Sequence, residues 1–307
     1  MQPLCWSPQF LPGWNPSRYD SRWRWHQGPI DDESAPHVEG AIISAWDGRW
    51  DGAAMDRFPV LRVISTYGVG TDHIDLHAAH ERHIVVCNTP DDVTDATAEM
   101  ALLLTLAAVR ELVRWDRVTR EGGFPPYRVD DALSGQLHGL AVGILGYGRV
   151  GQRIAELLRP FRTTLRYHRR SEPWLGHPGA CRSLPELAAA SRVLIVALPL
   201  TEHTHHLVDD HILSLMPRGS YLVNVGRGPV VNEDALVRHL HSGHLAGAGL
   251  DVYEHEPAIH PGLRAMPQVV LSPHRGTSTW ETRLRMTQTA VGNLVYGLTG
   301  APANRVI

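Results

Sequence analysis

The chain of 307 residues is long enough for two domains that each bury a substantial hydrophobic core. Its hydrophobic content of 43%, charged content of 20% and formal net charge of −3 favour neither nucleic acid nor an anionic membrane surface as a partner. The chain has no apolar run of about 18 residues and no recognisable signal peptide, so we expect no membrane span and a cytoplasmic location. Its three cysteines include no C-x-x-C pair, so we expect neither a disulfide framework nor cysteine-bound zinc.

The N-terminal half begins with a segment that resists assignment and continues with a regular series of strands. The first 35 residues are rich in Pro, Trp, Arg and Ser and show little periodicity. Short apolar runs follow at residues 38–45, 61–67 and 84–88, and each ends near Gly, Pro, Asn or Asp. Runs of this kind, separated by helix-length segments, predict buried parallel strands.

A long apolar-rich helix is predicted over residues 94–118, with Thr94 or Asp95 as its N-cap, and residues 119–138 are loop-like. A second series of strands is then predicted at residues 141–146, 164–168, 193–198, 221–225, 246–252 and 269–272, with helices at 149–159 and 232–241. The alternation predicts an α/β protein of two doubly wound parallel-sheet, Rossmann-like domains with an interdomain cleft.

A glycine-rich loop with the spacing G-x-G-x-x-G follows the predicted strand at 141–146 and opens the predicted helix at 149–159. This context is the one that the dinucleotide fingerprint requires, whereas a glycine-rich turn without a ligand is the alternative. Gly146 allows the tight turn, Gly148 lets the backbone approach a pyrophosphate, and Gly151 allows close packing of helix on strand. We expect the cofactor at Gly146, Tyr147, Gly148, Arg149, Val150 and Gly151.

The end of the next predicted strand indicates which dinucleotide is bound. In NAD sites an acidic residue stands about 20 residues after the loop and accepts hydrogen bonds from the ribose hydroxyls. Here the chain carries Arg169, Arg170 and Ser171 and no acid. Two guanidiniums can bind a 2′-phosphate, so we predict NADP(H), with NAD(H) as the other option. A solvated turn is the alternative explanation of the two arginines.

Three further stretches place charged side chains at predicted strand ends. Arg227 follows the strand at 221–225, Asp251 and Glu256 follow the next strand, and His274 follows the strand at 269–272. Ligands of doubly wound sheets bind beyond the carboxyl ends of the strands. The arrangement therefore favours one catalytic site, while a cap of the predicted helix at 277–298 is the alternative role for His274.

From about Gly40 to its end, the chain resembles the D-isomer-specific 2-hydroxyacid dehydrogenases, most closely the glyoxylate and hydroxypyruvate reductases. The resemblance rests on ordered motifs: G-V-G-T-D-H-I-D (68–75), N-T-P (88–90), T-A-E-M-A-L (97–102), G-Y-G-R-V-G (146–151), L-P-L-T (198–201), N-V-G-R-G (224–228), D-V-Y-E-H-E-P (251–257) and S-P-H (272–274). It implies that residues 1–92 and 274–307 form the substrate-binding (catalytic) domain. Residues 93–273 would form the NAD(P)-binding Rossmann domain.

The resemblance also implies roles for single residues in the NAD(P)H-dependent reduction of a small 2-oxo acid to a D-2-hydroxy acid. His274 would exchange the proton, Glu256 would orient the imidazole, and Arg227 would bind the substrate carboxylate and carbonyl. The remaining expected contacts are Val69 and Gly70 to the substrate, and Thr97, Leu198, Pro199, Val225, Gly226 and Asp251 to the cofactor.

Several features depart from the family pattern or leave alternatives open. Arg275 stands where relatives often carry an aliphatic residue, and Phe124 stands where they often carry Trp. The histidine-rich residues 202–211 lack metal-ligand spacing, so we expect surface histidines and no metal. Relatives suggest a homodimer. A dinucleotide-sensing, corepressor-like protein of the same fold, with little turnover, is the alternative to an enzyme.

Overall fold

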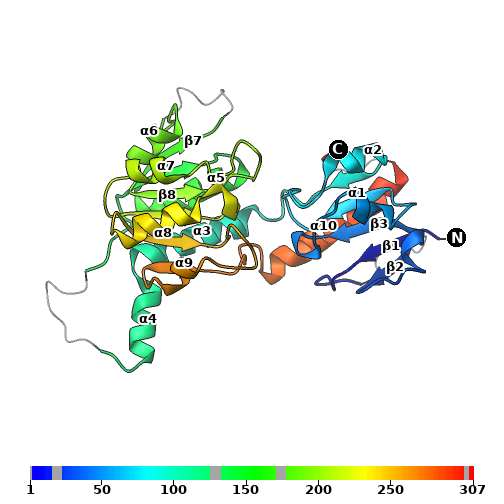
Figure 1. Ribbon diagram of the computed structural model, residues 1–307, viewed down its shortest axis with the longest axis horizontal. Coiled ribbons are helices and arrows are strands. Elements are labelled where there is room, and N and C mark those ends of the chain that lie inside the picture. Colours follow the sequence, from blue (N-terminus) through cyan, green and yellow to red (C-terminus); the bar gives the residue numbers. More distant parts are fainter. Residues whose placement is uncertain (1, 16–22, 125–132, 171–177, 301–303) are drawn as a thin grey trace. The chain divides into compact units, whose positions relative to one another are not determined.

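The computed structural model describes residues 2–15, 23–124, 133–170, 178–300 and 304–307. The chain divides into two compact units (Figure 1). Met1–Val93 and Thr277–Ile307 form the first unit, and Thr94–Gly276 form the second. In the described part of the chain, no helix combines the length and apolar character needed to cross a membrane.

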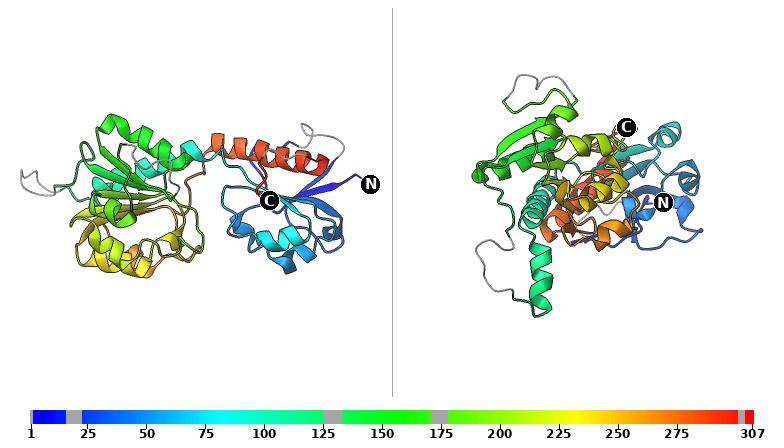
Figure 2. Two further views of the ribbon diagram at one scale, coloured as in Figure 1. Left: turned by 90° about the horizontal axis from the view of Figure 1, so that it is seen from above. Right: turned by 60° about the vertical axis from the view of Figure 1, so that its left-hand side comes forward.

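The first unit is a parallel five-stranded sheet with helices on both faces. Its strands occur in the order β2-β1-β3-β4-β5. Their bounds are β1 Leu4–Ser7, β2 Arg24–Gln27, β3 Val38–Ile43, β4 Val63–Thr66 and β5 Val85–Cys87. One face packs on α10 (Trp280–Thr299), and the other packs on α1 (Gly52–Asp56) and α2 (Leu76–Glu81), as Figure 2 shows. In the core between the sheet and helices α1 and α2, the rings of Trp6 and Trp50 both stack on Phe58.

The second unit is a parallel six-stranded sheet in the order β11-β10-β9-β8-β6-β7. Its strands are β6 Ala141–Leu145, β7 Thr164–His168, β8 Val193–Val196, β9 Ser220–Asn224, β10 Leu245–Leu250 and β11 Val269–Leu271. Its helices are α3 Thr94–Val109, α4 Leu112–Arg120, α5 Arg149–Leu158, α6 Leu184–Ala189, α7 Asp210–Leu215, α8 Glu233–His241 and α9 Pro261–Ala265. The chain runs from β6 outward to β7 and then returns to β8 on the other side of β6, which creates a switch point beside the glycine loop.

Separate apolar cores cover the two faces of this sheet. Side chains of α3 and α5 pack on one face, and side chains of α6, α7 and α8 pack on the other. The central strands β8 and β9 are almost continuously buried because both of their faces are covered. The predicted fold class, two parallel-sheet α/β domains, is confirmed, while the cleft between them stays a prediction.

Two sequence predictions about secondary structure need correction. The first 35 residues, which showed no period, contain β1 and β2 at one side of the first sheet. The helix predicted over 94–118 is two helices, because Glu111 adopts a left-handed conformation with φ of 50°. The carbonyl of Val109 accepts a hydrogen bond from the amide of Gly135, which takes the place of continued helical pairing.

Candidate active site

The predicted chemical residues of the second unit follow six neighbouring strands at one edge of one sheet. All six strands are parallel, so their carboxyl ends lie at the same edge. The glycine loop follows β6, Arg169 and Arg170 follow β7, and Leu198 and Pro199 follow β8. Arg227 follows β9, Asp251 and Glu256 follow β10, and His274 follows β11. The topology therefore gathers these groups at the edge where ligands of such sheets bind.

His274 and Glu256 form a direct pair. The imidazole Nδ1 lies 2.8 Å from Glu256 Oε2, and both side chains are about three-quarters buried, at 26% and 23% relative exposure. The other carboxylate oxygen of Glu256 accepts a hydrogen bond from the backbone N–H of Tyr253 at 2.9 Å. Glu256 is therefore held from both oxygens, and its position fixes the plane of the imidazole.

Asp251 organises the backbone around His274. Its carboxylate accepts hydrogen bonds from Ser272 Oγ at 2.6 Å and from the amides of Arg275 and Gly276 at 2.7 Å each. Its carbonyl also accepts from the amide of His274 at 2.7 Å. His274 has a φ of 53°, which is uncommon outside glycine, and these four bonds stabilise that conformation.

His274 is not the cap of the helix that follows it. The helix α10 begins at Trp280, and its N-cap is Thr279, whose side chain accepts from the amide of Thr282. The alternative role of His274 as a capping residue is therefore wrong. Its left-handed backbone and its bond to Glu256 are explained by the local site instead.

Arg227 lies on a tight turn that a buried asparagine shapes. The Asn224 side chain accepts from the amide of Gly226 at 3.0 Å and donates to the carbonyl of Arg227 at 3.0 Å. The next residue, Gly228, packs on the backbone of Tyr253 so closely that an added Cβ would lie 1.8 Å from that residue's carbonyl carbon. The Arg227 loop and the Glu256 loop are thus in direct contact, and glycine is required at their junction.

The glycine loop has the geometry that a pyrophosphate requires. Gly146 has φ of 99°, and an added Cβ would lie 2.6 Å from the Ala197 carbonyl oxygen. A Cβ on Gly151 would overlap the Gly146 carbonyl, whereas one on Gly148 would meet nothing within 4 Å. Helix α5 begins here with Gly148 as its N-cap and without a side-chain cap bond. Open space beside the amide groups of a helix N-terminus fits a bound dinucleotide.

The end of β7 is basic, as the sequence indicates. Arg169 is half-buried and Arg170 is exposed, and no acid stands among residues 164–170. Ser171 lies outside the described residues. The ring of Tyr147, in the glycine loop, stacks on Tyr167 of β7 at a centroid distance of 3.8 Å. This contact joins the glycine loop to the strand that the two arginines follow.

Comparison with known proteins identifies the family. The model of the D-isomer specific 2-hydroxyacid dehydrogenase NAD-binding domain matches residues 102–276, more than half of the chain. The chain belongs to this family. The glyoxylate reductase of Thermococcus kodakarensis is 38% identical over 264 residues, which cover 83% of this chain and 79% of that protein.

Two crystal structures extend the likeness over the full length of this dehydrogenase family member. A protein of Thermus thermophilus matches with a TM-score of 0.91 and 37% identity, over 99% of this chain and 100% of that chain. An NADPH-dependent glyoxylate/hydroxypyruvate reductase of Sinorhizobium meliloti, solved with NADP and malonate, matches with a TM-score of 0.85 and 33% identity, over 100% of this chain and 97% of that chain.

The other residues expected from the family are placed as follows. Thr97 lies in the first turn of α3, which packs on α5, and Val225 and Gly226 are buried at the end of β9. Val69 and Gly70 follow β4 in the first unit, where the Val69 side chain is exposed and its carbonyl accepts from Asn88 Nδ2 at 3.0 Å. Substrate contacts by Val69 and Gly70 stay predictions, as do the cofactor contacts of Thr97, Leu198, Pro199, Val225 and Asp251.

Sequence reasoning missed the side chains that organise these loops. Asn224 and Ser272 lie inside the quoted motifs, and an asparagine or serine at a strand end is a signal for bonds to nearby backbone. His206, Asn232 and Glu254 also lie close together, although they come from three loops. Nothing in the local sequence indicates that last contact, because it depends on the order of the strands.

Proposed function

We propose that this protein uses NADPH to reduce a small 2-oxo acid, such as glyoxylate or hydroxypyruvate, to the D-2-hydroxy acid. The observation that carries the proposal is the His274–Glu256 pair, 2.8 Å apart, at the sheet edge that also carries the glycine loop. The names of its relatives support this substrate class, since the Thermococcus protein is a glyoxylate reductase and the Sinorhizobium protein is a glyoxylate/hydroxypyruvate reductase.

His274 is the proton donor in this proposal. Glu256 holds the imidazole through Nδ1, so Nε2 is the nitrogen that faces the carbonyl oxygen of the substrate. An imidazole can exchange a proton in either direction near neutral pH, which suits a group that donates a proton to the carbonyl oxygen. When bound, NADPH supplies the hydride that the substrate carbon accepts.

Arg227 is the substrate anchor, assisted by backbone amides of the first unit. A guanidinium presents parallel N–H donors that match a carboxylate, and the Arg227 turn is held by the buried Asn224. The backbone amides of Val69 and Gly70 are proposed to bind the substrate carboxylate. With the substrate held in this way, the 2-oxo group is presented to His274.

NADP(H) is the proposed cofactor, with NAD(H) as the poorer one. The open space at Gly148 and the uncapped N-terminus of α5 fit the pyrophosphate, and Arg169 and Arg170 supply positive charge where NAD sites carry an acid. Asp251 is proposed to accept from the nicotinamide amide. Assembly as a homodimer and a cytoplasmic location remain predictions.

A panel of 2-oxo acids tests the function. NADPH oxidation should be measured with glyoxylate, hydroxypyruvate, pyruvate and larger acids, for the native protein and for His274→Ala. We expect turnover on at least one small acid, and a loss of about a thousand-fold or more in kcat for the variant with NADPH affinity nearly intact. His255→Ala, which removes an exposed ring next to Glu256, should keep kcat within about two-fold.

Two outcomes would contradict the proposed enzymatic function. Tight NADPH binding without turnover on any acid would favour the dinucleotide-sensing alternative. Near-normal turnover of His274→Ala would remove the proposed proton donor, whatever the substrate.

A further inference from the structure

His206 joins the loops after β8 and β9. It lies in the histidine-rich segment that follows β8, and its backbone amide donates to the carbonyl of Pro229 at 2.7 Å. Two further bonds, Val208 N to Val230 O and Asn232 N to Val208 O, extend this pairing. The segment after β8 therefore runs beside the turn that begins at Arg227.

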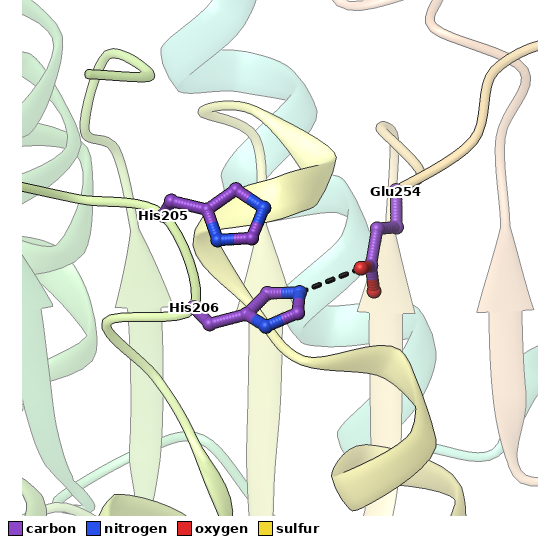
Figure 3. A group of neighbouring side chains, drawn as sticks. All are labelled: His205, His206 and Glu254. Carbon is purple, nitrogen blue, oxygen red and sulfur yellow. Dashed lines mark hydrogen bonds and ion pairs between the residues drawn. The ribbon is translucent and has the colours of Figure 1, made fainter. Parts of the chain in front are cut away.

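The imidazole of His206 bonds to the side chains of Asn232 and Glu254, and these two bonds fix its tautomer. Asn232 uses its side-chain oxygen as the N-cap of α8, accepting from Ala235 N at 2.8 Å, so its amide nitrogen faces His206 Nδ1 at 3.3 Å. An amide nitrogen only donates, so Nδ1 accepts and the proton of the neutral ring is on Nε2. Nε2 then donates to Glu254 Oε1 at 2.6 Å (Figure 3).

Glu254 carries the network to the loop after β10. Its second oxygen accepts from the amide of Glu233 at 3.2 Å, and its own amide donates to Glu233 Oε1 at 2.9 Å. Glu254 is two residues before Glu256, and the amide of Tyr253, the residue before Glu254, bonds to Glu256. The loops that carry Arg227 and Glu256 are therefore both tied to the ring of His206.

We propose that His206 and Glu254 are positioning residues, which hold the Arg227 turn and the Glu256 loop in the relative arrangement that catalysis requires. This inference rests on the proposed function. A shift of about 1 Å at a catalytic group can cost about a hundred-fold in rate. Loss of the His206 ring, which bonds to both loops, should therefore lower kcat measurably.

A bound metal ion is the competing explanation of the same side chains. The nearest ligand atoms of His205, His206 and Glu254 lie within 4.8 Å of one another. However, the Asn232 amide donates to His206 Nδ1, so the proton of the neutral ring is on Nε2, the nitrogen that faces Glu254. A metal ion binds an imidazole nitrogen that carries no proton, so a metal at Nε2 would need the proton on Nδ1, where the Asn232 amide already donates. A proton, and not a cation, joins His206 to Glu254.

Substitutions at His206 test the positioning role. For His206→Ala we expect kcat to fall about ten- to hundred-fold, with KM for NADPH within about two-fold. A role in stability alone would instead lower the melting temperature and leave the kcat of the folded enzyme unchanged. His206→Gln, which keeps a donor for Glu254, should recover part of kcat. His205→Ala is the matched control and should behave as the native protein.

Further measurements distinguish failure of this inference from failure of the proposed function. Imidazole nitrogen NMR of the native protein should show the Nε2–H tautomer of His206 near neutral pH, whether or not any 2-oxo acid is turned over. A doubly protonated ring or the other tautomer would overturn the network. An unchanged kcat in folded His206→Ala, in an active enzyme, would overturn the positioning role. Tight one-to-one Zn²⁺ binding that His205→Ala abolishes would replace it with a metal site.

Discussion

The two ends of the active edge of the second sheet are built in opposite ways. Around β6 and β7, the structure leaves space: Gly148 faces an opening, and α5 begins without a side-chain cap. Around β9, β10 and β11, buried polar side chains fill the edge. Asn224 bonds to its own turn, and Asp251 accepts four hydrogen bonds from residues 272–276.

The difference shows which part of the site is prepared before ligands bind. Groups that take part in charge transfer gain most when they are held in place in advance, because no reorganisation is then needed during the reaction. A phosphate-binding end instead needs unsatisfied amide groups, which the ligand completes. Substitutions near β10 should therefore change kcat, and substitutions near β7 should change the use of the cofactor.

Asp251→Asn should have the largest effect of the comparison. Whichever way the amide is turned, an NH₂ group replaces an oxygen that now accepts from Ser272 and Arg275 or from Gly276, so a buried N–H loses its acceptor. The left-handed His274 would then be poorly held. We expect kcat to fall about a hundred-fold, measured by steady-state NADPH oxidation.

Ser272→Ala is the control for this substitution, because it removes one donor and leaves the carboxylate with both amides. Its kcat should fall by no more than about ten-fold. If Asp251→Asn instead weakened NADPH binding and spared kcat, the carboxylate would act mainly on the nicotinamide and not on the His274 loop.

The fold could be predicted where apolar runs recur at regular intervals, and prediction failed over the first 35 residues, which hold the buried β1 and the polar β2. The apolar runs of β6, β8 and β9 can only be buried, so the sequence locates them. Strand β2, Arg24–Gln27, has four polar or aromatic residues and no apolar run. The break at Glu111 carries no Gly or Pro, and the bond from Gly135 that accompanies it spans 26 residues.

The candidate site divides in the same way. Motifs located Arg227, Glu256 and His274 because their chemistry requires these residue types at strand ends, and the His274–Glu256 contact has the expected geometry. Their catalytic roles stay predictions. The supporting bonds from His206 to Asn232 and Glu254 span 26 and 48 residues. Contacts of this length follow from strand order and not from local pattern, so sequence reasoning could not locate them.

The double substitution Arg169→Ala with Arg170→Ala tests the part of the sheet edge around β6 and β7, and it should have an intermediate effect. Loss of the two guanidiniums that we propose to bind the 2′-phosphate should lower kcat/KM for NADPH about ten-fold or more and spare NADH, since only NADPH carries this phosphate. Steady-state kinetics with both cofactors provide the measurement. Arg182→Ala, an exposed arginine elsewhere in the unit, is the control for the loss of a surface charge. An unchanged cofactor preference would leave the two arginines as a solvated turn.

Glu233→Gln should have the smallest effect. It tests the unfavourable burial of Glu233 beside the charge of Glu254, near the carboxyl ends of β9 and β10. Burial, and then the charge of Glu254, raise the pKa of Glu233. An acid whose pKa is raised by folding is stabilising below its unfolded pKa of about 4.5, and that stability is lost as pH rises through the folded pKa. Glutamine stays neutral and keeps an acceptor for the Glu254 amide. We therefore expect the melting temperature of the variant to exceed that of the native protein by about 2 °C near neutral pH, with the difference shrinking toward pH about 4.5.

Asp234→Asn, an exposed neighbour with the same charge change, is the control and should show no such pH-dependent gain. An equal gain in Asp234→Asn would assign the effect to net charge rather than to the buried pair of Glu233 and Glu254.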